Sequence, residues 1–448
     1  MDMAAHALNT KAEQGFADHY EAAKTALPGA DAPWASGLRT EAMRVYAAAG
    51  LPHRRIEEWK YTDLRSHLSE AFAPRTDAAP SVPGDDLARL LGPLGAIDSH
   101  RMVLVDGHVD MAASDFGGVE EGCELLSLAD ALAAPPDWFE TTFGSSIAVD
   151  GNAVLALNTA LMTGGAILRV PDGTVLAKSV HIVHVHASSE PASAAIRNLV
   201  IAGQGASLTV LESHVGASEA AGQCNAATEV FIGEGATVHH VKDQRESVET
   251  THLSSWLVRL EADATYDAFQ FSAGSALARH QIFVEFAGEG ASLNLNGAFM
   301  ARGKQHIDTT LVVDHAVPHC TSRELFKGVL DDTAKGIFQG KIIVQPHAQK
   351  TDGKQMAQAL LLSETAEFDS KPELEIFADD VVCGHGATSG QIDEELLFYL
   401  RARGIPEPKA RALLIAAFVG EALDQIEDEA VREGLLAAAE DWLSQKDL

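Results

Sequence analysis

The residues best suited to chemistry in this chain are Cys383 and His385, which are separated by one glycine and followed by Gly386. On an extended strand, such a pair would share one face and lie about 7 Å apart along the chain. Thiolate and imidazole are ligands of zinc, copper and iron–sulfur centres. Two ligands do not complete a four-coordinate site, so a distant residue or a second chain would have to supply the others.

Gly384 and Gly386 remove side-chain bulk beside this pair, which lets another surface approach closely. The simpler interpretation is a half-buried cysteine with a nearby histidine in a turn. Residue spacing alone leaves both interpretations open.

A second group of imidazoles lies between residues 181 and 186. On a strand, His184 and His186 would share one face, with His181 on the other, and two imidazoles could bind a metal ion. The simpler interpretation is a solvated strand face. His239 and His240 are adjacent, so their side chains should point in opposite directions and make a poor joint site.

Several common catalytic motifs are absent from the sequence. Gly340 and Lys341 are followed by Ile342 and lack the upstream glycine of a phosphate-binding loop, so we expect no nucleotide hydrolysis by this chain itself. No HExxH zinc motif and no GxSxG nucleophile motif occurs. The cysteines form no CxxC pair and are too far apart for a disulfide framework, which favours reduced thiols and a cytoplasmic location. They are Cys123, Cys224, Cys320 and Cys383.

The elements that must position these residues are mostly short strands. Residues 101–110 (RMVLVDGHVD) predict a hairpin with its turn at Asp106-Gly107, and residues 113–163 are less regular, with short helices. A weak repeat then recurs at steps of 33, 30, 28 and 27 residues, each unit having a turn residue, small residues and an apolar residue that starts a strand. The units begin at Asp172, Gly205, Gly235, Asp263 and Gly290.

Such a repeat favours stacked coils, in which each coil buries its face against the next. We therefore predict a parallel β-helix over residues 97–390. The alternative is a large β-sandwich, which would need more two-residue hairpin turns than this chain has. Stacking also explains how a chain of 448 residues exceeds the size of about 250–300 residues at which single cores stop growing.

Helices are predicted on both sides of this core. Residues 1–96 form an N-terminal helical domain and linker, with one helix ending at Gly50 and a loose segment at 74–95 that holds one short helix. Residues 391–448 form a C-terminal helical domain, in which two amphipathic helices pair after a first helix ends at Gly404. These helices could cap the end of the β-helix or dock a partner.

The bulk composition limits the classes of partner. With 64 acidic and 33 basic residues, the net charge is −31, which argues against nucleic acid or anionic lipid as the main partner and favours a protein with basic patches. The first residues contain no signal-peptide core, and no segment has the roughly 20 apolar residues of a membrane span.

The chain from about 310 to 405 resembles the signature region of the SufD branch of the SufB/SufD family of iron–sulfur cluster assembly proteins. The resemblance rests on LLLSETAEFDSKPELEIFADDVVCGHGATSGQIDEELLFYLRARGI, and upstream on residues 323–330, 338–342 and 349–352. GLPHRRIEEWKYTDLR near the N-terminus echoes it. The form Cys-x-His-Gly-Ala-Thr-x-Gly followed by LFYL is similar to SufD rather than to its paralogue SufB.

The resemblance implies a mainly β fold with a right-handed parallel β-helix core between two α-helical domains. It implies a non-catalytic scaffold subunit of the SufBCD complex, a heterodimer with SufB through the β-helices, and a SufC ATPase docked on the C-terminal helical domain. His385 would then lie at the SufB interface, where it holds or positions a transient iron–sulfur cluster, with Cys383 beside it. ATP would enter only through SufC, and the assembly would associate with reduced flavin, for which this chain shows no motif.

Two alternatives to this function remain open. A β-helix carbohydrate-active enzyme would need acidic residues facing one groove, but Glu394-Glu395 and Asp379-Asp380 are adjacent pairs whose side chains a strand would separate. A homodimeric scaffold acting without SufB is the other alternative, and the isolated chain could form a homodimer.

Overall fold

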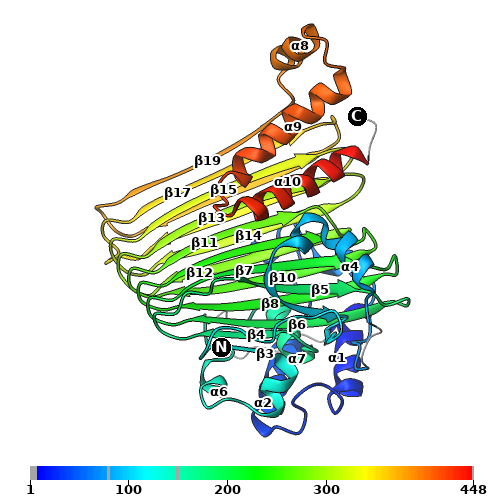
Figure 1. Cartoon of the computed structure of the whole chain (residues 1–448), viewed down its shortest axis with the longest axis vertical. Helices are drawn as coiled ribbons and strands as arrows, with labels where there is room; N and C mark the ends of the chain where they lie inside the picture. Colours follow the sequence, from blue (N-terminus) through cyan, green and yellow to red (C-terminus); the bar gives the residue numbers. More distant parts are fainter. Residues whose placement is uncertain (1–7, 78–80, 148–150, 446–448) are drawn as a thin grey trace.

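A parallel β-helix forms the centre of the molecule (Figure 1), seen in a computed structural model that describes residues 8–77, 81–147 and 151–445. From β4 onwards, successive strands alternate between two long sheets, so each coil gives one strand to each sheet, and all of these strands pair in parallel. The antiparallel pairs are β1 with β2 and β3 with β4. The predicted parallel β-helix core with flanking helices is confirmed.

The bounds of the strands follow the coils in order. The ten-stranded sheet contains β2 (His108–Val109), β1 (Ser99–Val105), β5 (Ser179–His186), β7 (Ser207–Gly216), β9 (Thr237–Arg245), β11 (Thr265–Ser272), β13 (Ser292–Ala301), β15 (Thr321–Leu330), β17 (Asp352–Leu361) and β19 (Val382–Gly390). The nine-stranded sheet contains β3 (Glu124–Ser127), β4 (Ala166–Val170), β6 (Ala192–Ala202), β8 (Gly222–Ile232), β10 (Thr250–Leu260), β12 (Leu277–Phe286), β14 (His306–His315), β16 (Lys335–Val344) and β18 (Glu367–Ile376).

The sequence repeat marks one corner of each coil. Gly205, Gly235, Asp263 and Gly290 have φ angles of 65°, 64°, 54° and 76°, in the left-handed region that glycine adopts most easily. The alanine after each of them is buried under the next coil. The same corner recurs beyond the recognised repeat at His319 and Lys350, with φ angles of 62° and 66°. The repeat therefore continues where its sequence signature is lost.

Between the sheets, the lumen has an apolar half and a polar half. On β7, the inward-facing positions run from Leu208 and Val210, in the main apolar core, to Glu212 and His214, which are also buried. The other strands of this region follow the same alternation, because inward positions recur every second residue. The polar half of the lumen is defined here by Glu246, in the turn before β10, and by the following strand residues: His184, Glu212, His214, Cys224, His240, Lys242, His252, Ser254 and His280.

Helices from the first third of the chain cover the early coils (Figure 1). The predicted helix end at Gly50 is confirmed, with φ of 68° there, and α7 packs against α2, β6 and β8. The loop 50–65 is tied to the core because Arg279 donates to the carbonyl of Glu58 at 2.7 Å and lies 3.8 Å from the Trp59 ring centroid. The bounds are α1 Lys11–Ala23, α2 Pro33–Ala49, η1 Glu57–Trp59, α3 Leu64–His67, α4 Gly84–Leu91, η2 Gly92–Ala96, α5 Leu128–Ala133, α6 Phe139–Thr142 and α7 Ala153–Leu161.

The C-terminal helices α8 (Glu394–Ala402), α9 (Glu407–Leu423) and α10 (Glu429–Ser444) match the predicted helical segments. Helix α9 packs on the outer face of β13 and β15 and against α10, which also contacts η2. In Figure 1, α9 and α10 lie across the side of the β-helix and α8 projects beyond them. The interpretation of these helices as a cap is therefore wrong: their apolar faces bury against the side of the coils.

Residues 1–7, which include the start of the segment lacking a signal-peptide core, and residues 78–80 of the predicted linker lie outside the described residues. Within the described ranges, no helix has the length and apolarity needed to span a membrane. The domain boundaries at 96/97 and 390/391 stay predictions.

Candidate functional site

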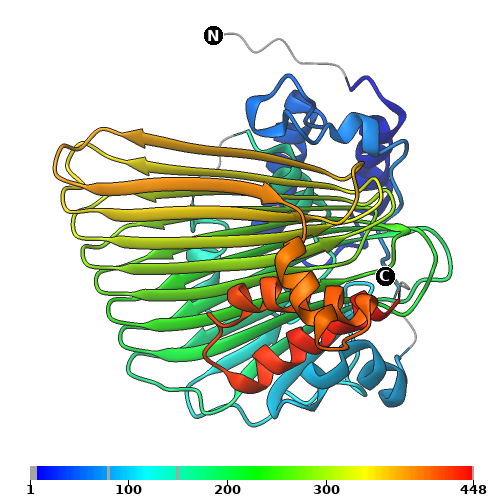
Figure 2. The ribbon, with the colours of Figure 1, turned by 90° about the horizontal axis from the view of Figure 1, so that it is seen from above.

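The last coil leaves both sheets with a free edge. β18 and β19 are the final strands of the two sheets, and in the described chain no further strand pairs with them. Seen from above, the coil crosses the open end of the stack (Figure 2). Unlike the largely buried strands of the earlier coils, β18 and β19 consist of exposed and half-buried residues throughout. A long strand with an unpaired row of backbone N–H and C=O groups is a template for pairing with another chain.

Cys383 and His385 both lie on this edge strand. Cys383 is opposite Gly353 of β17, and His385 is opposite Gln355. Cys383 is half-buried and packs against an apolar group that includes Ile342, so its side chain faces the interior side of the coil. His385 follows two residues later and is exposed. The structure thus places both predicted residues on one strand, at positions i and i+2.

The thiol of Cys383 is held in its neutral form in this chain alone. Burial raises the pKa of Cys383 above its usual value, and the carboxylates of Asp352 and Glu324 raise it further. Without a metal ion or a cationic neighbour, this thiol is therefore a poor nucleophile at neutral pH. A cation supplied from outside would favour the thiolate.

Glu324 on β15 also lines this region, although no sequence motif marks it. Its position on β15 is opposite Gln355 of β17, which in turn is opposite His385. The carboxyl group is 3% exposed, and neither oxygen accepts a well-formed hydrogen bond from the described residues. Burial raises the pKa of Glu324 to about 8. The sequence signal for its burial was its position two residues before Phe326, which places both side chains on the same face of β15.

A groove of about 530 Å³ runs beside the edge strand. A Cβ atom at Gly386 would lie 2.7 Å from Cε of Met356, whereas one at Gly384 would meet open space. At Gly386, the missing side chain therefore makes room for Met356 of the same chain. At Gly384, the space beside the backbone is open. The lining includes Asn296, Arg323, Lys354, Met356, His385 and Gln425.

The histidines of β5 are not on a solvated face, and that interpretation is wrong. His184 is 6% exposed and faces the lumen, while His181 is fully buried with Nε2 2.9 Å from Oγ of Ser213. His186 is half-buried, and its Nδ1 lies 3.3 Å from Oδ1 of Asp106. Both faces of β5 are covered, which periodicity alone did not reveal.

The prediction for His239 and His240 is confirmed. His240 is buried, with Nε2 3.2 Å from Oε2 of Glu212, whereas His239 lies on the other face beside Asp267. The acidic pairs weighed for a carbohydrate-active enzyme do not lie on strands: Glu394 and Glu395 are in the first turn of α8, and Asp379 and Asp380 are in the loop between β18 and β19.

The projecting C-terminal helices carry a second exposed surface. Large apolar side chains on α8 and α9 are open to solvent, with Phe398 72% exposed and Tyr399 53% exposed. Leu396 on α8 and Leu413 on α9 are 51% and 45% exposed. Clusters of this kind on a soluble surface mark interaction sites more often than isolated exposed residues do.

Comparisons with known proteins agree on one family. The model of the SufBD core domain of the SUF system for FeS cluster assembly matches residues 184–418, and the model of the SufBD protein N-terminal region matches residues 10–182. The chain is 33% identical to the iron–sulfur cluster assembly protein SufD of Escherichia coli (strain K12), over 87% of this chain and 88% of that protein. It is 32% identical to a SufBD family protein of Synechocystis sp., over 84% of each chain. It is 26% identical to SufD of Bacillus subtilis, over 91% of this chain and 93% of that protein.

Proposed function

Because this chain belongs to the SufBD family of iron–sulfur cluster assembly proteins, we propose that it is a non-catalytic scaffold subunit that pairs with SufB through its open β-helix end. The observation that carries this proposal is the free edge of β18 and β19 at the last coil of the stack. A second β-helix could continue both sheets across this end by strand addition.

The side chains around the free edge support the same partner surface. Val382 on β19 is 60% exposed, and Phe377 and Ile376 at the end of β18 are 61% and 40% exposed. An apolar edge strand of this kind is an aggregation hazard unless a partner covers it. A heterodimer with SufB would remove that hazard, and a homodimer of the isolated chain would use the same edge.

Cys383 and His385 would then contribute to a nascent iron–sulfur cluster, which is the cargo of the assembly. Both side chains lie within the surface that a partner would cover, so ligands from SufB could complete the coordination that two residues cannot. His385, the more exposed of the two, is the stronger candidate ligand, with Cys383 beside it.

The SufC ATPase would dock on the C-terminal helices. The exposed apolar residues of α8 and α9 present an amphipathic helical surface suited to a groove on a partner. ATP would act through SufC, and reduced flavin would belong to the complex, because the sequence offers no motif for either. A cytoplasmic location is part of this proposal, and it is supported by cysteines that are all free.

The test uses tagged full-length chain produced together with SufB and SufC. His385→Ala should retain both partners in copurification and lower iron–sulfur enzyme maturation in cells, while His347→Ala, a change at another exposed histidine, should leave both unchanged. Normal maturation with His385→Ala would overturn the assignment of this site.

A second pair of variants tests the two surfaces separately. Val382→Glu should release SufB by placing a charge on the edge strand, and Phe398→Asp should release SufC while SufB stays bound. Met111→Asp, at a residue 70% exposed elsewhere in the chain, is the matched control. Retention of both partners by the first two variants would contradict the proposed surfaces.

A further inference from the structure

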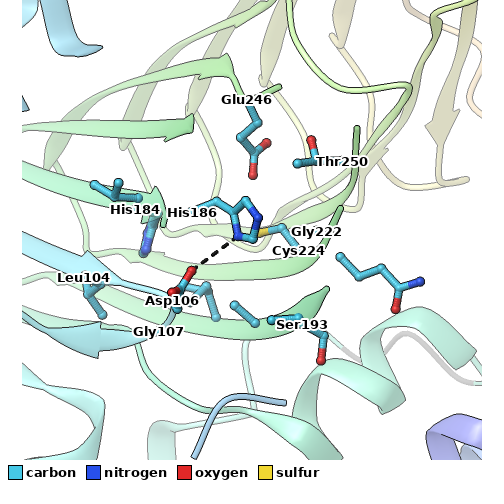
Figure 3. A pocket seen from close by; sticks show the side chains of 15 residues that line it. Leu104, Asp106, Gly107, His184, His186, Ser193, Gly222, Cys224, Glu246 and Thr250 are labelled. Carbon is cyan, nitrogen blue, oxygen red and sulfur yellow. Dashed lines mark ion pairs between the residues drawn. The ribbon is translucent and has the colours of Figure 1, made fainter. Parts of the chain in front are cut away.

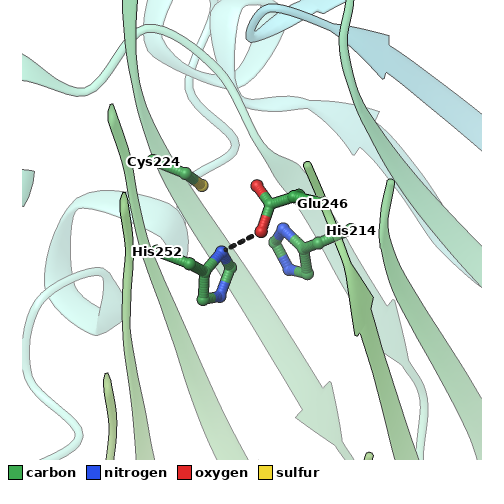
Figure 4. Close-up of side chains that lie close together, drawn as sticks. All are labelled: His214, Cys224, Glu246 and His252. Atoms are coloured by element: carbon green, nitrogen blue, oxygen red, sulfur yellow. Dashed lines mark ion pairs between the residues drawn. The ribbon is translucent and has the colours of Figure 1, made fainter. Parts of the chain in front are cut away.

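Four side chains with metal-binding atoms converge inside the lumen, far from the free edge. His214, Cys224, Glu246 and His252 each offer one ligand atom, and these four atoms lie within 4.8 Å of one another (Figure 4). His214 comes from β7 in one sheet, while Cys224 and His252 are directly opposite each other on β8 and β10 in the other sheet. The coils from β7 to β19 are spaced by about 4.8 Å each, so this cluster is roughly 29 Å from the coil of Cys383.

The fold leaves no freedom in where these side chains point. The coil register pairs His252 with Cys224, and His214 shares the inward phase of the buried Val210 on β7. Glu246 reaches the cluster from the turn between β9 and β10, and its Oε2 lies 2.7 Å from Nδ1 of His252. The site is therefore built by three coils and does not depend on a mobile surface loop.

The hydrogen bonds around the cluster orient both rings. His214 Nε2 is 2.7 Å from Oε1 of Glu212, while Nδ1 of His214 has no hydrogen-bond partner among the described residues, although the side chain is fully buried. Nζ of Lys242 is 2.9 Å from Nε2 of His252, which leaves Nδ1 of that ring on the side of Glu246. The contact of His214 with Glu212 is of the kind that typically holds a metal-bound histidine, in which the second ring N–H donates to a carboxylate. The contact of His252 is different, because Lys242 is a donor only, so metal binding at Nδ1 of His252 would require Nε2 to carry the proton and Lys242 to turn away from it.

The unpaired imidazole nitrogen argues against a self-sufficient polar network. Buried polar atoms in native proteins nearly always find a partner, because an unpaired one carries its full desolvation cost. His214 Nδ1 is such an atom, and both ring nitrogens of the adjacent His184 also lack a partner in the described part of the chain. The His184 and His214 rings are stacked with centroids 4.5 Å apart. A bound ion would give His214 the missing partner.

The buried charges also favour a dication. In their usual ionised forms, Glu212 and Glu246 carry two negative charges against one positive charge on Lys242, and all three side chains are buried. A thiolate at Cys224 and one divalent cation would bring the sum to zero. Uncompensated charge in an interior is costly, so this balance favours occupancy.

A small cavity opens beside the cluster (Figure 3). Its volume is about 30 Å³, room for one ion or water, and Cys224 and Glu246 line it. Its other side is lined by the half-buried His186 and by Asp106, which form an ion pair with each other. Cys224 is half-buried as a whole residue and borders this cavity.

We propose that His214, Cys224, Glu246 and His252 form a mononuclear site for a divalent transition-metal cation inside the β-helix, separate from the surface of Cys383 and His385. Two imidazoles, a thiolate and a carboxylate suit a borderline ion such as Zn²⁺ or Fe²⁺ rather than Mg²⁺ or Ca²⁺. Tetrahedral bonds of about 2.0–2.3 Å would place the ligand atoms about 3.3–3.8 Å apart. The widest separations, up to 4.8 Å, would have to contract by about 1 Å, and the 2.7 Å contact between Oε2 of Glu246 and Nδ1 of His252 would have to lengthen.

The experiment is a titration of metal-free full-length chain with Co²⁺ under anaerobic conditions. Co²⁺ replaces Zn²⁺ and reports thiolate ligation by a near-ultraviolet charge-transfer band and four-coordination by its visible bands. We expect one Co²⁺ per chain with both signals, displaced by one equivalent of Zn²⁺. Anaerobic competition with Fe²⁺ then ranks the two physiological ions, and failure of both to displace Co²⁺ would overturn the proposal.

Cysteine variants identify the thiolate. Cys224→Ser should abolish the charge-transfer band and weaken Co²⁺ binding at least tenfold, whereas Cys123→Ser, at another half-buried free cysteine, and Cys383→Ser should retain the band. A band that is absent from the unmodified chain, or that survives in Cys224→Ser, would overturn the proposal. Loss of the band in Cys383→Ser would place the metal at the free edge and also overturn it.

A further variant tests the supporting carboxylate without removing a ligand. Glu212→Gln should keep the spectrum of the bound Co²⁺ but weaken binding by about 10–100-fold, the usual cost of losing such a partner. Circular dichroism of each metal-free variant checks the fold. Unchanged affinity in folded Glu212→Gln would contradict the role assigned to His214. Because the readout is metal binding, its failure leaves the maturation test of His385 unaffected.

Discussion

Lys327 on β15 and Glu421 on α9 form an ion pair across the interface between the β-helix and the C-terminal helices. The lysine side chain is 2% exposed while the glutamate is 69% exposed, so the buried ammonium reaches outward to an otherwise solvated carboxylate. Nζ of Lys327 also lies 4.3 Å from the ring centroid of Phe418. One side chain thus joins α9 to the core by charge and by cation–π contact.

The first prediction concerns this junction. Lys327→Ala should loosen α9, because it removes both contacts and leaves a cavity under the helix. Hydrogen exchange of residues 407–423 should become faster, and SufC retention should fall if these helices dock it. Lys354→Ala, at an exposed lysine of β17, is the matched control and should change neither. Equal exchange in the two variants would contradict the role of Lys327.

The second prediction concerns the pH dependence given by Glu324. Its pKa in the folded chain is about 8, against a value of 4.5 for an ordinary glutamate. Between these values the folded chain holds a proton that the unfolded chain releases, so this contribution to stability is complete below pH 4.5 and falls as pH rises through 8. The free energy of unfolding should decline by about 1.4 kcal/mol per pH unit relative to Glu324→Gln.

Urea unfolding of both chains from pH 5 to pH 8 measures this difference, because other titrating groups are common to the two proteins. Parallel stability curves would show that Glu324 is ionised in the folded chain.

The third prediction concerns the buried pair of Arg197 and Glu229. Nη2 of Arg197 lies 2.7 Å from Oε1 of Glu229, and the two side chains are 4% and 1% exposed. Arg197→Met should lower the free energy of unfolding by about 3–5 kcal/mol, since it leaves a buried carboxylate without its partner. Arg44→Ala, which removes an exposed pair with Glu41, should cost less than about 1 kcal/mol. Similar losses would contradict the argument from burial.

The fourth prediction concerns the left-handed corners. Gly235→Ala should destabilise by about 1–2 kcal/mol through backbone strain alone, because an added Cβ meets no atom within 4 Å. His319→Gly should stabilise by up to about 1 kcal/mol, since His319 already holds a φ of 62° and is exposed. Glu289→Gly, outside the left-handed region, should destabilise. Thermal unfolding compares the signs, and a gain in Gly235→Ala would contradict the corner assignment.

The coil architecture was predictable because a local requirement repeats in the sequence. Gly205 and Gly235 mark corners that need a left-handed residue followed by a small one, and this signal survives without any knowledge of long-range contacts. His319 and Lys350 occupy the same corner but carry no glycine signature, so the sequence repeat stopped two coils early. When contacts with neighbouring coils hold a non-glycine residue in the left-handed conformation, the local sequence does not reveal the corner.

The candidate site was only partly predictable. The spacing of Cys383 and His385 on one strand followed from periodicity, and the structure agrees. The burial of Glu324 and His184 did not, because polar residues in alternation usually indicate a solvated face. The missed signal was phase: His184 continues the inward row of Val180 and Ile182.

The placement of the C-terminal helices depends on contacts between distant segments. The apolar run around Ile415 predicted burial but could not say against which surface. Packing of α9 on β13 and β15, on the side of the stack rather than across its end, is a tertiary choice. It leaves the last coil free, which is the feature that the proposed partner requires.

The polar half of the lumen also bears on how the chain finds its register while folding. Rungs filled only with valine, leucine and alanine would stack almost equally well if a coil slipped to the wrong neighbour. Among the described residues, Glu212 has His214 and His240 at ion-pair distance, and Lys242 contacts His252 and Ser254 on the facing sheet. A coil in the wrong register would leave these buried charges without partners. The polar half of the lumen therefore favours the pairing of each coil with its correct neighbours.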